Sequence, residues 1–214
     1  MGVMLKFSLH WVNVVILAKF HNPSILNPDF LERNNIVPAE WKAIEVLTTP
    51  AFATVKYERN VVFILDQERL EIRKECDTFK DDYEVHEFAS KYVTILPHVT
   101  YQSVGLNWQI SIEKEEPERF LTERFINSEA LKESKSELLQ SSIKLSFKAD
   151  DAVCNLDFTP GKAKIPGKDI YNAIIINANF HHQGPFSSDQ IVAIITQWKD
   201  REDYFKKIIP RLLG

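Results

Sequence analysis

Cysteine, long apolar runs and a charge excess of one sign are all scarce in this 214-residue sequence. Cys76 and Cys154 are the only cysteines, and two cannot form the disulfide framework of a secreted protein, which favours a reducing, cytoplasmic environment. The apolar run near the N-terminus, residues 14–18, is too short to cross a bilayer. We therefore expect a soluble protein with no membrane partner.

The charge balance is close to neutral. The formal net charge is −4, and the two halves on either side of Leu96 carry −3 and −1. A general nucleic-acid binder neutralises phosphates with clustered lysines and arginines, so nucleic acid is not expected as a partner. No motif has the spacing that catalysis, metal binding or nucleotide binding demands. The sequence therefore predicts no catalytic residue, no metal site and no cofactor.

Residues 92–113 lie almost at the midpoint of the chain and separate two segments with similar patterns. In the first segment, residues 6–20 are rich in β-branched and aromatic side chains, which predicts a strand whose centre is covered on both faces. Pro28 begins a predicted short helix, because proline fits the first helical position. Three short segments from Ala51 onward predict tightly linked antiparallel strands. Helical spacing of apolar residues then predicts a helix over 83–96.

The second segment repeats this order. Residues 99–112 predict a strand with alternating apolar and polar side chains, in which Gly105 indicates a bulge or a close backbone approach. Pro117 begins a predicted helix that extends toward Glu133. Further strands are expected over residues 138–148, 152–158 and 170–181.

A long amphipathic helix is predicted at the C-terminus, over residues 187–209. Ser187 and Gln190 have the spacing of a capping box, and Asp189 favours the positive end of a helix. A stripe of apolar side chains continues at intervals of three and four residues, so this helix should form a main wall of the core.

Both segments thus read as strand, helix, three strands and helix. The predicted fold class is α+β: one antiparallel sheet with helices on one face, built from two pseudo-repeats related by a pseudo-twofold axis. The expected halves are residues 1–96 and 97–214, forming one continuous domain by internal duplication. This order resembles the duplicated fold of the TATA-binding protein and its helix-grip relatives, a likeness of architecture that carries no function.

Three stretches of the chain resemble a sporadically distributed family of uncharacterised bacterial proteins. They are Asn22 to Ile25, Tyr92 to Trp108, and Gly184 to Ile208. Where that family has arginines beside the glycine, this chain has Ser103 and Asn107. The family has no established activity, so the resemblance implies the fold and adds no function.

Two groups of residues are candidate sites. Lys162, Lys164 and Lys168 lie in a loop with glycines and could contact an anion, although a solvated loop is the simpler interpretation. His181 and His182 end a predicted strand, where neighbouring side chains point to opposite faces, so the two histidines cannot easily share one metal ion. Polar residues at a strand end are the simpler interpretation of this pair.

The sequence favours a non-enzymatic binding or protein-interaction module, with a protein partner or a homo-oligomer. The motivation is a large scaffold that carries no recognisable catalytic constellation. Two alternatives remain open. One is a helix-grip carrier of a small apolar ligand, held between the sheet and the C-terminal helix. The other is an enzyme that uses His181 or His182.

Overall fold

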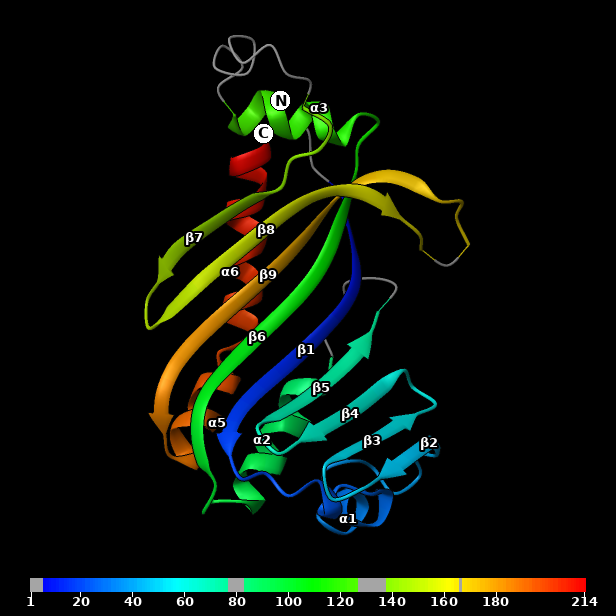
Figure 1. The fold of residues 1–214 in the computed structure, drawn as a ribbon, viewed down its shortest axis with the longest axis vertical. Coiled ribbons are helices and arrows are strands. Elements are labelled where there is room, and N and C mark those ends of the chain that lie inside the picture. The colour runs from blue at the N-terminus through cyan, green and yellow to red at the C-terminus, as the bar shows by residue number, and fades with distance from the viewer. Residues whose placement is uncertain (1–5, 77–82, 127–137, 166) are drawn as a thin grey trace.

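The computed structural model describes residues 6–76, 83–126, 138–165 and 167–214, which form one nine-stranded antiparallel sheet with helices (Figure 1). The strand order is β2-β3-β4-β5-β1-β6-β9-β8-β7. The strands are β1 (Phe7–Lys19), β2 (Ala43–Thr48), β3 (Phe52–Tyr57), β4 (Val61–Asp66), β5 (Arg69–Glu75), β6 (Thr100–Glu113), β7 (Ile143–Ala149), β8 (Ala152–Ala163) and β9 (Tyr171–Phe186). The described residues also form five α-helices: α1 (Pro28–Arg33), α2 (Val85–Ile95), α3 (Pro117–Phe125), α5 (Ser188–Thr196) and α6 (Trp198–Leu213). The protein is therefore α+β, as predicted.

Two long strands, β1 and β6, lie side by side at the centre of the sheet. They pair in antiparallel register, with Asn13 opposite Asn107. β5 and β6 flank β1, and helices cover one of its faces (Figure 1). Val12, Val14 and Ile16 are fully buried on the covered face, whereas Leu17 on the other face is 37% exposed. The prediction that both faces of this strand are covered is therefore wrong, and its apolar run continues onto a face without helices.

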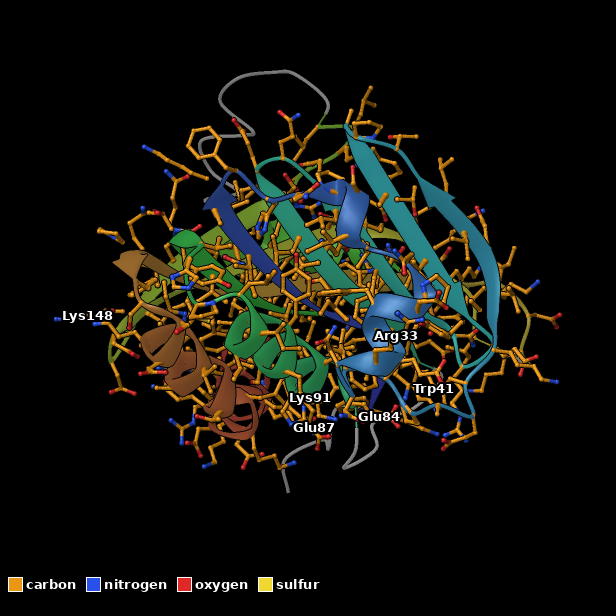
Figure 2. All side chains as sticks on the ribbon, turned by 90° about the horizontal axis from the view of Figure 1, so that it is seen from below. Arg33, Trp41, Glu84, Glu87, Lys91 and Lys148 are labelled. Atoms are coloured by element: carbon orange, nitrogen blue, oxygen red, sulfur yellow. The ribbon has the colours of Figure 1, made fainter. Side chains whose placement is uncertain are left out.

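Helices α2, α5 and α6 lie behind the sheet in Figure 1, and Figure 2 shows α1, α2 and α5 together on that same side. An aromatic cluster joins the two layers. The ring of Trp108 on β6 lies 4.3 Å from that of Trp198 and 5.2 Å from that of Phe205, both on α6. These buried rings fill the layer between the sheet and α6 and contribute strongly to the burial of apolar area.

The sequence missed one strand and joined two helices. β2 adds a fourth strand after α1, and its Ile44, Val46 and Leu47 are exposed at the edge of the sheet, so its pattern shows no buried face. The predicted C-terminal helix is divided at Gln197, whose backbone ψ of 7° leaves the helical range. The expected extension of α3 toward Glu133 lies outside the described residues.

Candidate functional site

The lysine loop lies at one end of the long β8–β9 pair. Lys162 pairs with Asn172 near the end of β8, and Lys162, Lys164 and Lys168 are all exposed. Among the described residues, none of the three forms an ion pair. The structure thus places them in solvent, and their contact with an anion stays a prediction.

The two histidines lie toward the other end of β9, so they do not share a site with the lysine loop. His181 pairs with Gly105 and faces a surface hollow, where its Nε2 lies 3.2 Å from Oε1 of Gln183. His182 points to the opposite, buried side of the strand and is 2% exposed. Alternation along a strand produces this separation, as expected from the sequence.

His182 belongs to a buried polar cluster between β9 and α6. Its Nε2 lies 3.7 Å from Oδ1 of Asp151, in the turn between β7 and β8. Burial lowers the pKa of His182, and this outweighs the attraction of Asp151, so the imidazole is neutral near neutral pH. Burial alone would raise the pKa of Asp151, but the charge of Arg201, and that of His182 once it is protonated at low pH, hold it below its ordinary value.

Arg201 is the centre of that cluster and is almost fully buried. Its guanidinium donates to the carbonyl of Ala149 at 3.1 Å, to Asp150 at 3.3 Å, and to Asp151 and Gln197. These contacts attach the β7–β8 turn to α6, so Arg201 has a structural role. Nothing in this arrangement leaves a polar atom of Arg201 directed toward solvent for a ligand.

The opposite side of the sheet is covered by no helix among the described residues, and it faces the viewer in Figure 1. We call it the helix-free face. On the central strands it is formed by the side chains of Asn13, Val15 and Leu17 of β1, Ser103, Asn107 and Gln109 of β6, and Asn177, Asn179 and His181 of β9.

Four asparagines stand in direct register across this face: Asn13, Asn107, Asn179 and Asn155. We call them the amide row. Asn155 donates to Asn179 at 3.2 Å, Asn179 donates to Asn107 at 2.6 Å, and Asn107 donates to Asn13 at 2.6 Å. Every bond runs in the same direction, so the amides polarise one another and hold each other in place.

The amide row continues to both sides through other polar groups. Asn13 donates to Glu71 of β5 at 2.8 Å, and Arg69 donates to the other oxygen of that carboxylate at 2.5 Å. At the far end, the hydroxyl of Ser146 on β7 donates to Asn155 at 2.7 Å. One chain of side-chain hydrogen bonds therefore crosses six adjacent strands, from β5 to β7.

Gly105 is needed beside this row. A Cβ at position 105 would lie 3.0 Å from Nδ2 of Asn179 and 3.5 Å from Nδ2 of Asn107. The glycine thus gives the two amides room to lie against the strand. The sequence predicted a bulge or a close backbone approach here. The strand register is continuous at this position, and the atoms that approach Gly105 belong to side-chain amides, so neither form of the prediction is correct.

Two hollows flank the row on the same face. A hollow of about 380 Å³ lies over β7, β8 and β9 beside Asn155 and Asn179. A second, of about 430 Å³, lies where β1 ends, β6 begins and β9 ends, and His181 lines it. The helix-free face is therefore a polar surface with recesses of the size that holds small ligands or side chains.

Sequence reasoning missed the amide row. Asparagine is depleted in strands, so Asn13, Asn107, Asn155 and Asn179 within four predicted strands were a usable signal. Their common register could not be predicted, because it depends on which strands become neighbours. Burial raises the pKa of the Cys154 thiol to about 12, as expected of an unreactive, buried cysteine.

The described residues contain no group of three or more metal-ligating side chains close enough to hold an ion. Within that same part of the chain, no helix has the length and apolar content needed to span a membrane. The sequence matches no protein-family model and no curated protein with which it was compared. The resemblance to the uncharacterised bacterial family stays a prediction.

Proposed function

We propose that this protein is a non-enzymatic binding module whose ligand surface is the helix-free face of its sheet. The amide row is the observation that carries the proposal. An asparagine amide has two N–H donors and two acceptor lone pairs, and each bond within the row uses only one of them. The row therefore presents further donors and acceptors at fixed positions, and a partner meets a surface that is already ordered.

The charges of the face favour an uncharged polar partner. Arg69 is paired with Glu71, and Lys144 lies 3.3 Å from Asp157, so cations and carboxylates alternate across the strands. A phosphate backbone needs an excess of cations. Peptide groups offer alternating N–H and C=O groups, so they match a row of amides better than a phosphate backbone does. We therefore propose a segment of a protein partner, or of a second copy of this chain, as the bound group.

The open edge of the sheet supports an interaction role. β2 has no neighbour on its outer side among the described residues, and Ile44 and Leu47 are about half exposed. Unpaired edge backbone and exposed apolar side chains are features of strands that pair with another chain. This edge adjoins the first half of the face, so a partner that crosses the amide row can extend along it.

We also propose that the sheet consists of two pseudo-repeats. β1 and β6 occupy equivalent central positions, and in each half the last strand returns to pair with the first: β5 with β1, and β9 with β6. The proposed pseudo-twofold axis passes between Asn13 and Asn107, the first two members of the amide row. This order supports the likeness to the duplicated fold of the TATA-binding protein.

The carrier and enzyme alternatives have less support. The rings of Trp108, Trp198 and Phe205 occupy the layer in which a helix-grip carrier would hold its ligand. His182 is buried against Arg201 and Asp151, and His181 has Gln183 as its side-chain partner. Neither histidine is placed beside a nucleophilic side chain by the contacts described above.

Affinity capture from cells with matched variants tests the proposed face. Asn155→Ala combined with Asn177→Ala removes amides from the face without adding bulk, and Lys91→Ala changes an exposed residue of α2 (Figure 2). We expect the face variant to lose captured protein by about fivefold or more, as for contacts near an interface centre. The Lys91→Ala variant should capture as much partner protein as the unchanged chain does. Equal capture by both variants would place the interface elsewhere.

A further inference from the structure

The hollow at the end of β1 has the construction of a ligand pocket. β1 and β6 change register between Leu17 and Ala18, and β6 and β9 change register between Tyr101 and Ser103. Gln102 therefore has no paired residue in either neighbouring strand and forms a bulge toward both. Bulges re-aim side chains and are frequent beside binding sites. We call this hollow, of about 430 Å³, the Gln102 pocket.

Close packing fixes the wall of the pocket opposite the bulge. A Cβ on Gly184 would lie 2.8 Å from the carbonyl oxygen of Gln102, so no larger residue fits there without displacing the backbone. The side chain of Gln183 donates to the same carbonyl at 3.4 Å. The recess is thus held by backbone and side-chain contacts between β6 and β9.

Several polar side chains that line the pocket have no protein partner. Ser103 is 3% exposed, and its hydroxyl forms no hydrogen bond with any described residue. Lys19, Thr100 and Gln102 also line the pocket, and their side chains form no hydrogen bond or ion pair within the described part of the chain. The hydroxyl oxygen of Ser103 is accessible from the pocket, so a ligand can accept a hydrogen bond from it.

The charge of the pocket has one sign. Lys19 supplies a cation, His181 lies beside it on the lining, and no acidic side chain lines the pocket among the described residues. Hydroxyl, amide and ammonium groups that converge without a carboxylate are suited to an anionic group. Charge-assisted hydrogen bonds from Lys19 would be the strongest contacts available there.

An apolar surface adjoins this polar pocket. Leu17 is 37% exposed, and Phe20, at the edge of a neighbouring hollow of about 340 Å³, is 90% exposed. Lys19 and Gln102 line both hollows, so the two adjoin, and the carboxylate of Glu68 lies on the lining of the second hollow only. An apolar ligand portion would lie beside Leu17 and Phe20 while its anionic group enters the pocket.

The backbone holds Phe20 in this exposed position. Its φ is 65°, a conformation that aromatic residues seldom adopt. Ala18 donates to the carbonyl of Glu68 at 2.9 Å, and His21 donates to that of Gln67 at 3.0 Å, so hydrogen bonds fix the chain on both sides of Lys19 and Phe20. Strained conformations that persist in this way cluster at ligand sites.

From this construction we infer that the Gln102 pocket binds a small ligand with a carboxylate or phosphate group and an apolar portion. The anionic group lies at Lys19 and Ser103, and the apolar portion lies on Leu17 and Phe20. The inference rests on the proposed function in that the pocket belongs to the helix-free face, and it goes beyond it: a small anionic ligand at this end of the face is distinct from the protein segment proposed at the amide row.

NMR titration of the purified, ¹⁵N-labelled full chain tests the inference. The probes are phenyl phosphate, benzoate, inorganic phosphate and the neutral benzyl alcohol. We expect saturable shifts at Gln102, Ser103 and Gln183 with phenyl phosphate or benzoate, and about tenfold weaker binding of benzyl alcohol. The tighter of the two aromatic anions identifies phosphate or carboxylate as the recognised group.

Variants separate the polar from the apolar contact. Lys19 is exposed and lies outside the core. Lys19→Gln should weaken the binding of both aromatic anions by about tenfold, and Lys91→Gln should leave their binding unchanged. Phe20→Ala should weaken the binding of the aromatic anions but leave the binding of inorganic phosphate unchanged. Absence of saturable shifts with every anion, equal binding of benzyl alcohol, or unchanged binding by Lys19→Gln would overturn the inference. These results come from pure protein and are independent of the capture experiment.

Discussion

Gly105 is the residue on which the geometry of the amide row depends most directly. It lies between the side chains of Asn107 and Asn179, and the row needs the space that its missing side chain leaves. Asn107, Asn155 and Asn179 are half-buried, so their amides can meet a partner and also bond one another, whereas Asn13 is buried. Strand geometry accounts for this, because residues in direct register lie closer together than any other pair on a sheet.

Gly105→Ala should destabilise the protein by about 1 kcal/mol, because the new Cβ displaces the Asn179 amide from its bond to Asn107. Urea unfolding measures this loss. Gly161→Ala is the matched control: its Cβ would lie 3.1 Å from Cδ1 of Ile175, the flexible end of a side chain that can move away. If both variants lost the same free energy of unfolding, the hydrogen bond between Asn179 and Asn107 would contribute no more than an ordinary side-chain contact.

Buried histidines make stability depend on pH. Burial lowers the pKa of His10, His21 and His182 below the ordinary value of 6.5. The unfolded chain then binds more protons than the folded chain at pH values below 6.5, so protonation favours unfolding. Stability from these groups is complete above that value and is lost as the pH falls through the folded pKa values.

We expect the urea midpoint to fall between about pH 7 and about pH 5, and His21→Phe to reduce the fall. Phenylalanine preserves an aromatic ring beside Tyr92, whose centroid lies 6.3 Å from that of His21, and removes the titrating group. His98→Gln, at an exposed position, is the control. A midpoint that falls equally in wild type and His21→Phe would contradict this origin of the pH dependence.

At the scale of elements, the division between α5 and α6 depends on polar residues within an apolar stripe. Ser187 and Gln190 form the predicted capping box at the start of α5. Trp198 and Phe205 are buried as the stripe predicts, but the intervening Arg201 and Glu202 are charged and buried as well. Arg201 binds Gln197, at the division, and the β7–β8 turn, so it connects the helix layer to the sheet.

Arg201→Met should cost about 2 kcal/mol in the free energy of unfolding, because it leaves the Ala149 carbonyl and Asp151 without their main partner. The partly exposed aspartates keep this below the loss expected for a fully buried pair. Arg119→Met is the control, because Arg119 pairs with Glu116 and Glu123 on the exposed side of α3. Its urea midpoint should hardly change; a comparable fall in both variants would refute the connecting role of Arg201.

At the scale of the whole molecule, the sequence predicted the layers of the fold, but it did not predict which strands lie next to one another. The alternation in residues 99–112 and the apolar centre of β1 predicted long central strands, and the amphipathic segments predicted helices on one face. β2 was missed because the exposed Ile44, Val46 and Leu47 give it no buried face. The Gln102 pocket could not be predicted, since it forms only where β1, β6 and β9 meet.

The amide row shows the same limit. Each asparagine is visible in the sequence, but the alignment of Asn13 with residues more than ninety positions away depends on the register between β1 and β6. Ser103 and Asn107, where the resembling family has arginines, both lie on the helix-free face. The residue pattern thus gives the side on which these groups lie, whereas strand pairing decides what they touch.

Site-specific photocrosslinking in cells is the most direct test of the helix-free face as the binding surface. Benzoylphenylalanine would replace Ser146 or Lys56, exposed on β7 and β3, and, as controls, Lys91 or Lys207, exposed on α2 and α6. The binding proposal predicts discrete crosslinked partners from Ser146 and Lys56 and none from the helix positions. Crosslinks to a defined partner from Lys91 and Lys207 alone would show that the protein binds through its helices, and would contradict the proposal.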